Sequence, residues 1–387
     1  MNVVFISNYY THHQAPFCEA MYKLTNGHFC FIETSPMEEE RKSMGWMQDN
    51  TKSFVKNVYA NEQDKVECEG LINNADIVIK GNGPYELIRK RIKAGKLTFI
   101  YSERVYKNNK ERRKIPFHYF KFGKWYRGYS NLFLLCASAF ASADYKKNGC
   151  FVNKAFKWGY FTELRKYDNV DVLLEEKKMK HRSVSILWAA RLIEWKHPEY
   201  AVYVAKKLKD EGFSFILNII GNGEKEKAIK RMIDEQDLSD CVKMLGAMSP
   251  DEVRNQMECS DIFLFTSDQN EGWGAVLNES MNSACAVVAS HAIGSVPFLI
   301  NDGENGLIYK DGDIEDLYSK VKWLIENEEK RIDVAQKAYY TVAKQWNAEN
   351  AASRLLILAS SLHKGEITPF ENGVCSVAHI LQNNWYR

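Results

Sequence analysis

Short apolar runs separated by polar, helix-forming stretches recur along all 387 residues of the chain. In the first half these runs are rich in β-branched and aromatic residues and predict strands at residues 2–7, 28–33, 75–80, 97–102 and 132–138. The second half repeats the pattern at residues 183–190, 213–221, 241–246, 261–267, 285–290 and 306–310. Because the runs are apolar on both faces, helices must cover both sides of each sheet. The pattern therefore predicts two parallel, doubly wound α/β domains.

Helical segments lie between the expected strands, among them residues 83–95, 197–212 and 313–331. A charged stretch without strand pattern, residues 164–182, marks the joint between the halves. We expect an N-terminal domain over residues 1–165, a linker over 166–182, a C-terminal domain over 183–362 and a tail over 363–387 that packs back on the N-terminal domain.

Composition narrows the class of protein. A content of 45% hydrophobic and 26% charged residues is that of a globular protein. The nine cysteines are scattered and never form a C-x-x-C pair, which argues against a disulfide framework or a zinc site. The first residues do not resemble a signal peptide, and the longest apolar run, from Leu132, is too short to cross a bilayer. We expect a cytoplasmic protein.

The net charge of +2 conceals an asymmetry between the halves. Residues 1–165 contain 26 Lys and Arg against 16 Asp and Glu, a balance of +10, which leaves −8 for residues 166–387. Residues 106–129 alone hold eight Lys and Arg against one acid, interleaved with aromatics. Without a recognisable nucleic-acid-binding motif, this composition favours an anionic membrane surface as a partner and argues against nucleic acid. The alternative is a basic loop packed on its own domain.

Candidate chemistry gathers where strands of the second half end, which is where ligands bind in such sheets. Arg191 and Lys196 follow one expected strand, Gly221 and Gly223 follow another, and Glu271 to Glu279 follows a third. The glycines at 272 and 274 open an expected helix, where backbone N–H groups favour an anion, and the two cations would complete a diphosphate clamp. Glu279, about two turns further along, would meet a neutral hydroxylated group such as a ribose.

Each feature also has an ordinary interpretation. The two cations could be solvated side chains, and the GNG sequence at 221–223 marks common turns, as its copy at 81–83 illustrates. The string from Asp311 to Asp313 could suggest a metal site, but it fits better as a turn in which Asp313 caps the next helix. The coincidence of three such segments at strand ends of one domain favours the diphosphate site.

The same segments resemble glycosyltransferase family 4, whose members are retaining enzymes of the GT-B fold, with two Rossmann-like domains facing a central cleft. The resemblance covers residues 183 to about 355 and rests on the E-x7-E signature at Glu271 and Glu279 and on the Arg191 and Lys196 pattern. It implies that Glu271 contacts the donor sugar, Glu279 the ribose, and the two cations the leaving diphosphate. Further donor contacts are implied for Gly221, Gly223, Leu245, Gly272, Trp273, Gly274 and Ala275, with Leu245 near the base and Trp273 narrowing the sugar pocket.

The first half departs from the family pattern at its expected catalytic positions. A glycine-rich turn is replaced by YYTHHQAPF, which puts His12, His13 and Gln14 on the acceptor side, and a strand-end histidine is replaced by a stretch containing Glu103. We expect His13 and Glu103 to be catalytic; a core or solvated histidine is the alternative for His12 and His13. Phe298 stands where the family often has an acid.

The resemblance implies a retaining, metal-independent glycosyltransferase without a cofactor. It would move a sugar from a UDP- or GDP-type donor to a saccharide or lipid-linked acceptor in surface-polysaccharide or glycolipid synthesis, with a peripheral position on the inner membrane face. The alternatives are a nucleotide-sugar epimerase or hydrolase of the same fold and a non-catalytic nucleotide-sugar-binding protein.

Overall fold

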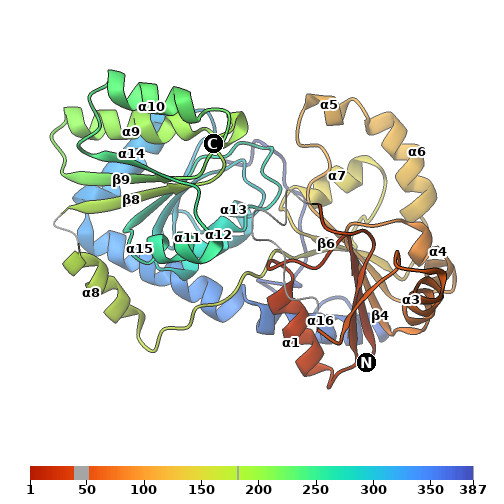
Figure 1. Cartoon of the computed structure of the whole chain (residues 1–387). Coiled ribbons are helices and arrows are strands. Elements are labelled where there is room, and N and C mark those ends of the chain that lie inside the picture. The colour runs from red at the N-terminus through yellow and green to blue at the C-terminus, as the bar shows by residue number, and fades with distance from the viewer. Residues whose placement is uncertain (39–51, 181–182, 387) are drawn as a thin grey trace. The chain divides into compact units, whose positions relative to one another are not determined.

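The computed structural model describes residues 1–38, 52–180 and 183–386, which form two compact units (Figure 1). Unit 1 consists of the described residues up to Glu163 together with Gln345–Gln382. Unit 2 consists of the described residues of Leu164–Lys344 together with those from Asn383 onward. Each unit is an α/β domain built on one parallel sheet.

The sheet of unit 1 has seven parallel strands in the order β3-β2-β1-β4-β5-β6-β7. Its strands are β1 (Val3–Ser7), β2 (Phe29–Glu33), β3 (Val55–Asn57), β4 (Ile77–Lys80), β5 (Thr98–Ser102), β6 (Leu132–Cys136) and β7 (Ala155–Lys157). The five predicted strands of this half are confirmed. The two edge strands, β3 and β7, were missed because three residues are too few to establish a strand pattern.

Helices cover the unit 1 sheet: α1 (Ala15–Leu24), α3 (Glu62–Asn74), α4 (Glu86–Lys93), α5 (Asn109–Arg112), α6 (Ile115–Tyr126), α7 (Ala141–Lys147) and, from the far end of the chain, α16 (Ala348–His363). Among these, α1 and α16 pack against each other.

The sheet of unit 2 has six parallel strands in the order β10-β9-β8-β11-β12-β13. They are β8 (Val184–Ala189), β9 (Phe215–Ile220), β10 (Val242–Gly246), β11 (Ile262–Phe265), β12 (Ala286–Ser290) and β13 (Leu307–Tyr309), all predicted from the sequence. The helical segments are α8 (Val170–Lys180), η1 (Glu194–Lys196), α9 (Pro198–Asp210), α10 (Glu226–Glu235), α11 (Pro250–Met257), α12 (Val276–Asn282), α13 (Val296–Leu299), α14 (Ile314–Glu326), α15 (Glu328–Tyr340) and η2 (Thr341–Gln345). Figure 1 shows α9 and α10 on one face of this sheet and α11, α12 and α15 on the other.

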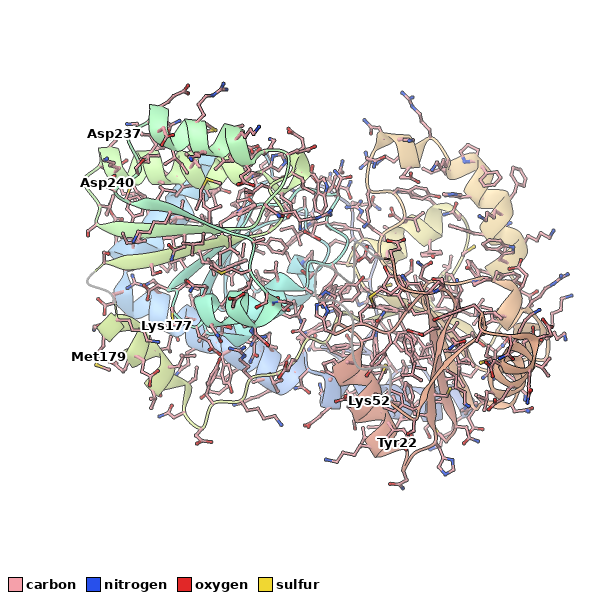
Figure 2. All side chains as sticks on the ribbon, viewed as in Figure 1. Tyr22, Lys52, Lys177, Met179, Asp237 and Asp240 are labelled. Atoms are coloured by element: carbon pink, nitrogen blue, oxygen red, sulfur yellow. The ribbon has the colours of Figure 1, made fainter. Side chains whose placement is uncertain are left out.

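The prediction of a linker over residues 166–182 is wrong for Val170–Lys180, because these residues form helix α8, which is part of unit 2. Leu173 and Leu174 are buried in its hydrophobic core. Lys177 is buried as well, and its ammonium donates to the carbonyls of Ser260 and Ser283, at 2.8 and 2.7 Å. Figure 2 shows Lys177 on the inner side of α8 and Met179 on the outer side. The charged composition concealed a helix with one buried face; residues 181–182 of the predicted linker lie outside the described residues.

The predicted end of the C-terminal domain, at residue 362, is also corrected. Helix α16 buries an apolar stripe that includes Leu355 and Leu358 and belongs to unit 1, where it packs on α1. The chain leaves unit 2 at η2, a π-helical segment just before α16. The sequence analysis did not single out this helix, and local hydrophobic periodicity does not indicate which core receives a buried helix.

The segment after α16 pairs with unit 1 and then returns to unit 2. The Lys157 amide donates to the Ser376 carbonyl, at 2.8 Å, beside an antiparallel bridge between Phe156 and Val377. Further on, the Trp385 indole donates to the His291 carbonyl of unit 2, at 3.1 Å. Residue 387 lies outside the described residues.

All nine cysteines are free thiols. Across the described ranges 1–38, 52–180 and 183–386, no helix has the length and apolar composition that a membrane span requires.

Candidate functional site

The loops that follow β8, β9 and β11 meet at the carboxyl edge of the unit 2 sheet, because these three strands are neighbours and parallel. The Leu192 amide donates to the Asn222 carbonyl, at 2.7 Å, and the Lys225 amide returns a bond to the Leu192 carbonyl, at 2.9 Å. On the other side, the Asp268 amide donates to the Trp195 carbonyl, at 3.1 Å. The structure thus brings together the three segments that the sequence placed at separate strand ends.

Gly221 and Gly223 are needed for this close approach. Their φ angles are +133° and +149°, a region that other residues rarely adopt. A Cβ on Gly221 would lie 1.9 Å from the Ala190 carbonyl oxygen, and one on Gly223 would lie 2.5 Å from that of Leu192. The GNG turn therefore lets the loop after β9 lie directly against the loop after β8.

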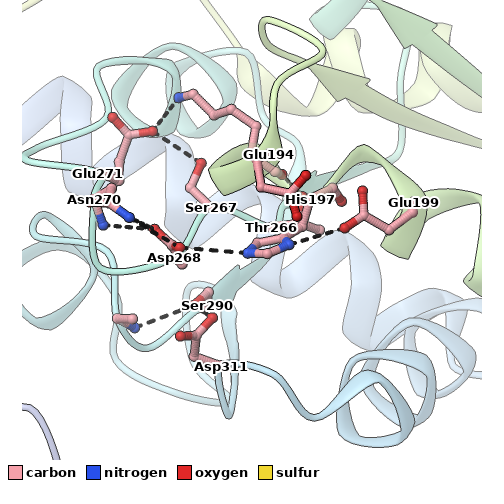
Figure 3. A network of polar contacts seen from close by, with 12 residues as sticks. Glu194, His197, Glu199, Thr266, Ser267, Asp268, Asn270, Glu271, Ser290 and Asp311 are labelled. Atoms are coloured by element: carbon pink, nitrogen blue, oxygen red, sulfur yellow. Dashed lines mark hydrogen bonds and ion pairs between the residues drawn. The ribbon is translucent and has the colours of Figure 1, made fainter. Parts of the chain in front are cut away.

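Lys196 and Glu271 form an ion pair between the loops after β8 and β11. Each side chain is only about one-tenth exposed, at 12% and 11%. The Lys196 ammonium also lies over the Trp195 ring, 4.4 Å from its centroid. The Ser267 hydroxyl donates to the Glu271 carboxylate, at 3.0 Å (Figure 3). Two groups predicted to hold different parts of a ligand are bonded to each other in this structure.

His197 is a functional-site candidate that sequence reasoning missed. It follows Lys196 in a left-handed conformation, with φ of 50°, and its ring lies between two carboxylates: Nδ1 is 3.1 Å from Glu199 and Nε2 is 3.7 Å from Asp268 (Figure 3). Hydrogen bonding to Asp268 and Glu199 raises the pKa of His197 to about 9. The imidazolium therefore links the loop after β11 to the start of α9. Asp268 is distant from His197 in sequence, so no local pattern indicates the contact.

Glu279 lies on α12, which begins at Val276, two residues later than predicted. The residue keeps some exposed surface, but its carboxyl group is surrounded by protein, and this desolvation raises its pKa to about 7. The positive charges of Arg254 and Arg165 oppose the shift. A carboxyl group with this pKa is poised between its neutral and charged forms near neutral pH.

The turn before α12 is tightly packed. Gly274 has a φ of +86°, and a Cβ there would lie 2.4 Å from the Phe265 ring. Trp273 is fully buried and its indole donates to the Asn278 side chain, at 2.9 Å. The ring thus has no exposed surface to present to a ligand, whereas we expected it to narrow a sugar pocket. Neighbouring Gly272 is buried and Ala275 is partly exposed.

Two further predicted residues lie at the margins of the carboxyl edge. Arg191, two residues after the end of β8, is exposed to solvent. Leu245 is partly exposed on β10, the edge strand of the sheet.

The candidates in unit 1 form a second cluster, at the ends of β1 and β5. The His12 and His13 rings are 3.9 Å apart, and the His13 ring stacks on Tyr160, at 5.9 Å. The Tyr160 hydroxyl donates to one Glu103 oxygen and the Lys107 ammonium to the other, each at 2.7 Å. Tyr160, which the sequence analysis did not single out, therefore connects His13 to Glu103.

Gln14 forms hydrogen bonds within the turn that precedes α1. Its side-chain oxygen accepts from the Thr11 amide and hydroxyl, at 3.1 and 2.7 Å. In this structure Gln14 therefore holds the turn that carries the two histidines.

The predicted cap at Asp313 is confirmed, because its side chain accepts from the Asp316 amide at the start of α14. Among the described residues, no three His, Cys, Asp or Glu side chains gather as metal ligands would.

The fold is that of the GT-B glycosyltransferases, with two parallel-sheet Rossmann-like domains, as predicted from the sequence. A structure of Anabaena Alr3699/HepE in complex with UDP matches with a TM-score of 0.69 and 14% identity, covering 94% of this chain and 100% of that one. A structure of TarM matches with a TM-score of 0.63 and 12% identity, covering 93% and 98%.

The sequence of unit 2 is similar to that of known glycosyltransferases. Residues 170–341 match the model of glycosyl transferases group 1. The amylovoran biosynthesis glycosyltransferase AmsK of Erwinia amylovora is 32% identical over 180 residues, which cover 45% of this chain and 44% of that protein. The putative colanic acid biosynthesis glycosyltransferase WcaL of Salmonella typhimurium is 25% identical over 48% of each chain. The chain thus spans under half the length of these curated relatives.

Proposed function

We propose that the protein is a retaining, family 4 glycosyltransferase that moves a sugar from a nucleotide donor to a saccharide or lipid-linked acceptor. One observation carries the proposal: the ion pair of Lys196 and Glu271 joins two strand-end loops inside the segment that matches glycosyl transferases group 1. The sugar-polymer relatives AmsK and WcaL support a role in surface-polysaccharide or glycolipid synthesis.

In this proposal unit 2 binds the donor. Lys196 and Arg191 neutralise the charge that develops on the leaving diphosphate, Glu271 accepts from the sugar hydroxyls, and Glu279 accepts from the ribose. The acceptor hydroxyl attacks the anomeric carbon on the face that the diphosphate leaves. Its proton passes to the departing phosphate oxygen as the C–O bond to phosphate breaks, so atoms and charge balance without a cofactor or a metal.

Unit 1 would bind the acceptor. A hydroxyl, a carboxylate and an imidazole come together in Tyr160, Glu103 and His13, which follow β7, β5 and β1. This set suits the hydroxyls of a sugar. His12 extends this surface. We place the enzyme in the cytoplasm, where nucleotide sugars of the UDP or GDP type would be its donors.

A labelled-donor assay tests the proposal. The purified chain is incubated with UDP-glucose first, because UDP and UDP-glucose are the ligands of the Anabaena structures, and then with GDP sugars, with saccharide and lipid-linked acceptors. Transfer with the donor's anomeric configuration, read by NMR, is the expected result. Release of free sugar alone would indicate a hydrolase, conversion of the donor an epimerase, and binding without turnover a non-catalytic protein.

Two variants test whether Arg191 and Lys196 bind the leaving diphosphate. Arg191→Ala and Lys196→Ala should each lower turnover about 10²- to 10³-fold, the usual loss when one preorganised charge contact is removed. Lys196→Ala should also lower the thermal midpoint, because Glu271 loses its partner, whereas exposed Arg191 is dispensable for folding. Lys230→Ala, an exposed lysine on α10, is the matched control. Wild-type turnover in both folded variants would refute these roles.

A further inference from the structure

Helix α6 of unit 1 carries large aromatic side chains on its solvent-facing side. Phe117, Tyr119 and Phe120 are 64%, 42% and 75% exposed. A helix on the surface of a globular protein normally turns polar residues outward. Three exposed aromatics within four residues therefore need an explanation other than the folding of unit 1.

The opposite side of the same helix packs against the rest of unit 1. Tyr126 is buried, the Phe122 ring stacks on Tyr145 at 5.6 Å, and His118 lies 3.3 Å from the Tyr106 hydroxyl. Because this inner face already supplies the packing, Phe117 and Phe120 are not needed to hold α6 in place.

Positive charge surrounds the exposed aromatics. Arg113, Lys114, Lys124 and Arg127 are exposed, and Lys121 lies 4.6 Å from the centroid of the Trp125 ring. The single acid of residues 106–129, Glu111, is bonded to Lys114 at 2.9 Å. The outward face of α6 thus combines protruding aromatic rings with an excess of cations.

Here the outward face of α6 means Phe117, Tyr119, Phe120 and Lys124 on the helix, together with the exposed Arg113 just before it and Arg127 just after it. We propose that the outward face of α6 docks unit 1 on the surface of an anionic lipid bilayer. Aromatic rings partition into the headgroup region, and each nearby cation strengthens adsorption to anionic lipid about 5-fold. The face combines both requirements, and the eight Lys and Arg against one acid in residues 106–129 complement an anionic surface. The proposal does not depend on the transferase reaction, although docking there would bring unit 1 to a lipid-linked acceptor.

Co-sedimentation of the full chain with vesicles tests the docking. Vesicles of phosphatidylcholine alone are compared with vesicles that also contain phosphatidylglycerol, at low and high salt. The wild type should pellet with the anionic vesicles at low salt and be released by high salt, since exposed charges are screened within about 8 Å at physiological ionic strength. A wild type that stays in the supernatant with anionic vesicles at low salt, or that binds both vesicle types equally, overturns the proposal.

Two double variants separate the aromatic from the ionic contribution. Phe117→Ser with Phe120→Ser should weaken binding at least about 10-fold. Arg113→Ser with Lys124→Ser should weaken it about 25-fold and flatten the salt dependence. All four positions are exposed, so the fold should tolerate both changes.

Matched controls come from unit 2. Val172 and Met179 on α8 are 55% and 77% exposed, and Lys227 and Lys230 on α10 are exposed lysines. Their Ser double variants should bind vesicles as the wild type does, and equal losses in the controls would contradict a specific face on α6. Light scattering then tests whether the protein dimerises through this face. A wild-type dimer that dissociates in the Phe117→Ser, Phe120→Ser variant would identify the face as a contact between copies and overturn lipid docking.

Discussion

At the scale of single residues, the candidate donor site holds its charges in contact with one another. Lys196 is bonded to Glu271, and His197 lies between Glu199 and Asp268. Under the proposed function, a diphosphate must compete with Glu271 for the Lys196 ammonium. The ion pair keeps both largely buried charges compensated while no ligand is bound, and it makes donor binding an exchange of one anion for another.

This exchange predicts opposite effects of two conservative changes on nucleotide affinity. Glu271→Gln frees Lys196, so free UDP or GDP should bind as tightly as to the wild type or more tightly, while sugar transfer falls. Glu279→Gln should weaken free nucleotide and donor alike, because it removes the proposed ribose contact. Isothermal titration of both variants with nucleoside diphosphate and with nucleotide sugar measures the contrast. Equal loss of nucleoside diphosphate affinity in both would contradict the assignment of the two acids.

The raised pKa of Glu279 predicts that its charged form, which the proposed ribose contact uses, lowers the stability of the folded protein. Its pKa of about 7 exceeds the ordinary glutamic acid value of 4.5, so the folded state binds the proton more tightly than the unfolded state does. Burying the carboxylate therefore costs stability above about pH 7, and this cost disappears as the pH falls toward about 4.5. Glu279→Gln should stabilise unit 2 by about 1–3 kcal/mol at about pH 8 and hardly at all at about pH 4.5.

Thermal midpoints across this pH range measure the effect. The control is Glu235→Gln, whose side chain is 67% exposed, and which should show no such pH dependence. A gain for Glu279→Gln that is independent of pH would show that desolvation of the charge is not its cause.

At the scale of elements, the site depends on how closely three strand-end loops approach. The turn at Gly221 and Gly223 lies against the loop after β8, and the loop after β11 is tied to the same segment through Asp268. The loop that carries Lys196 thus has neighbours on two sides, and these contacts come from the parallel order β9-β8-β11.

A pair of glycine substitutions tests whether this close approach matters. Gly212→Ala, at a positive φ with open space around it, should cost about 1–2 kcal/mol from backbone strain alone. Gly221→Ala adds an overlap with the Ala190 carbonyl, so it should lower the thermal midpoint further and displace the loop after β8. Nucleotide affinity is the second readout. Equal midpoints and equal affinity in the two variants would show that the turn tolerates a side chain.

At the scale of the whole molecule, the chain crosses between its units more than once. It leaves unit 1 after Glu163, returns to it through α16, and ends with contacts from Trp385 to unit 2. Each unit is therefore assembled from segments that are distant in sequence.

This division predicts which fragment of the chain folds. A fragment of residues 164–344 keeps α8 and the core of unit 2, and it should unfold cooperatively and bind nucleotide. A fragment of residues 183–362, which follows the boundaries expected from sequence, loses the buried residues of α8 and exposes the apolar stripe of α16. It should aggregate or melt without a sharp transition. Calorimetry and nucleotide titration of both fragments decide the matter, and equal behaviour would refute the assignment of α8 to unit 2 and α16 to unit 1.

The local sequence determined the two parallel α/β domains, since buried strands and amphipathic helices are encoded by apolar spacing within a few residues. It also indicated which strand ends carry Lys196, Glu271 and Glu279. Only the tertiary structure decided that Lys196 and Glu271 bond to each other, that His197 contacts Asp268, and that α16 joins unit 1. These outcomes depend on contacts between residues far apart in the chain and on burial, which changes the pKa of Glu279 and leaves Phe120 exposed. Neither the long-range contacts nor the burial of a side chain is encoded in a local sequence pattern.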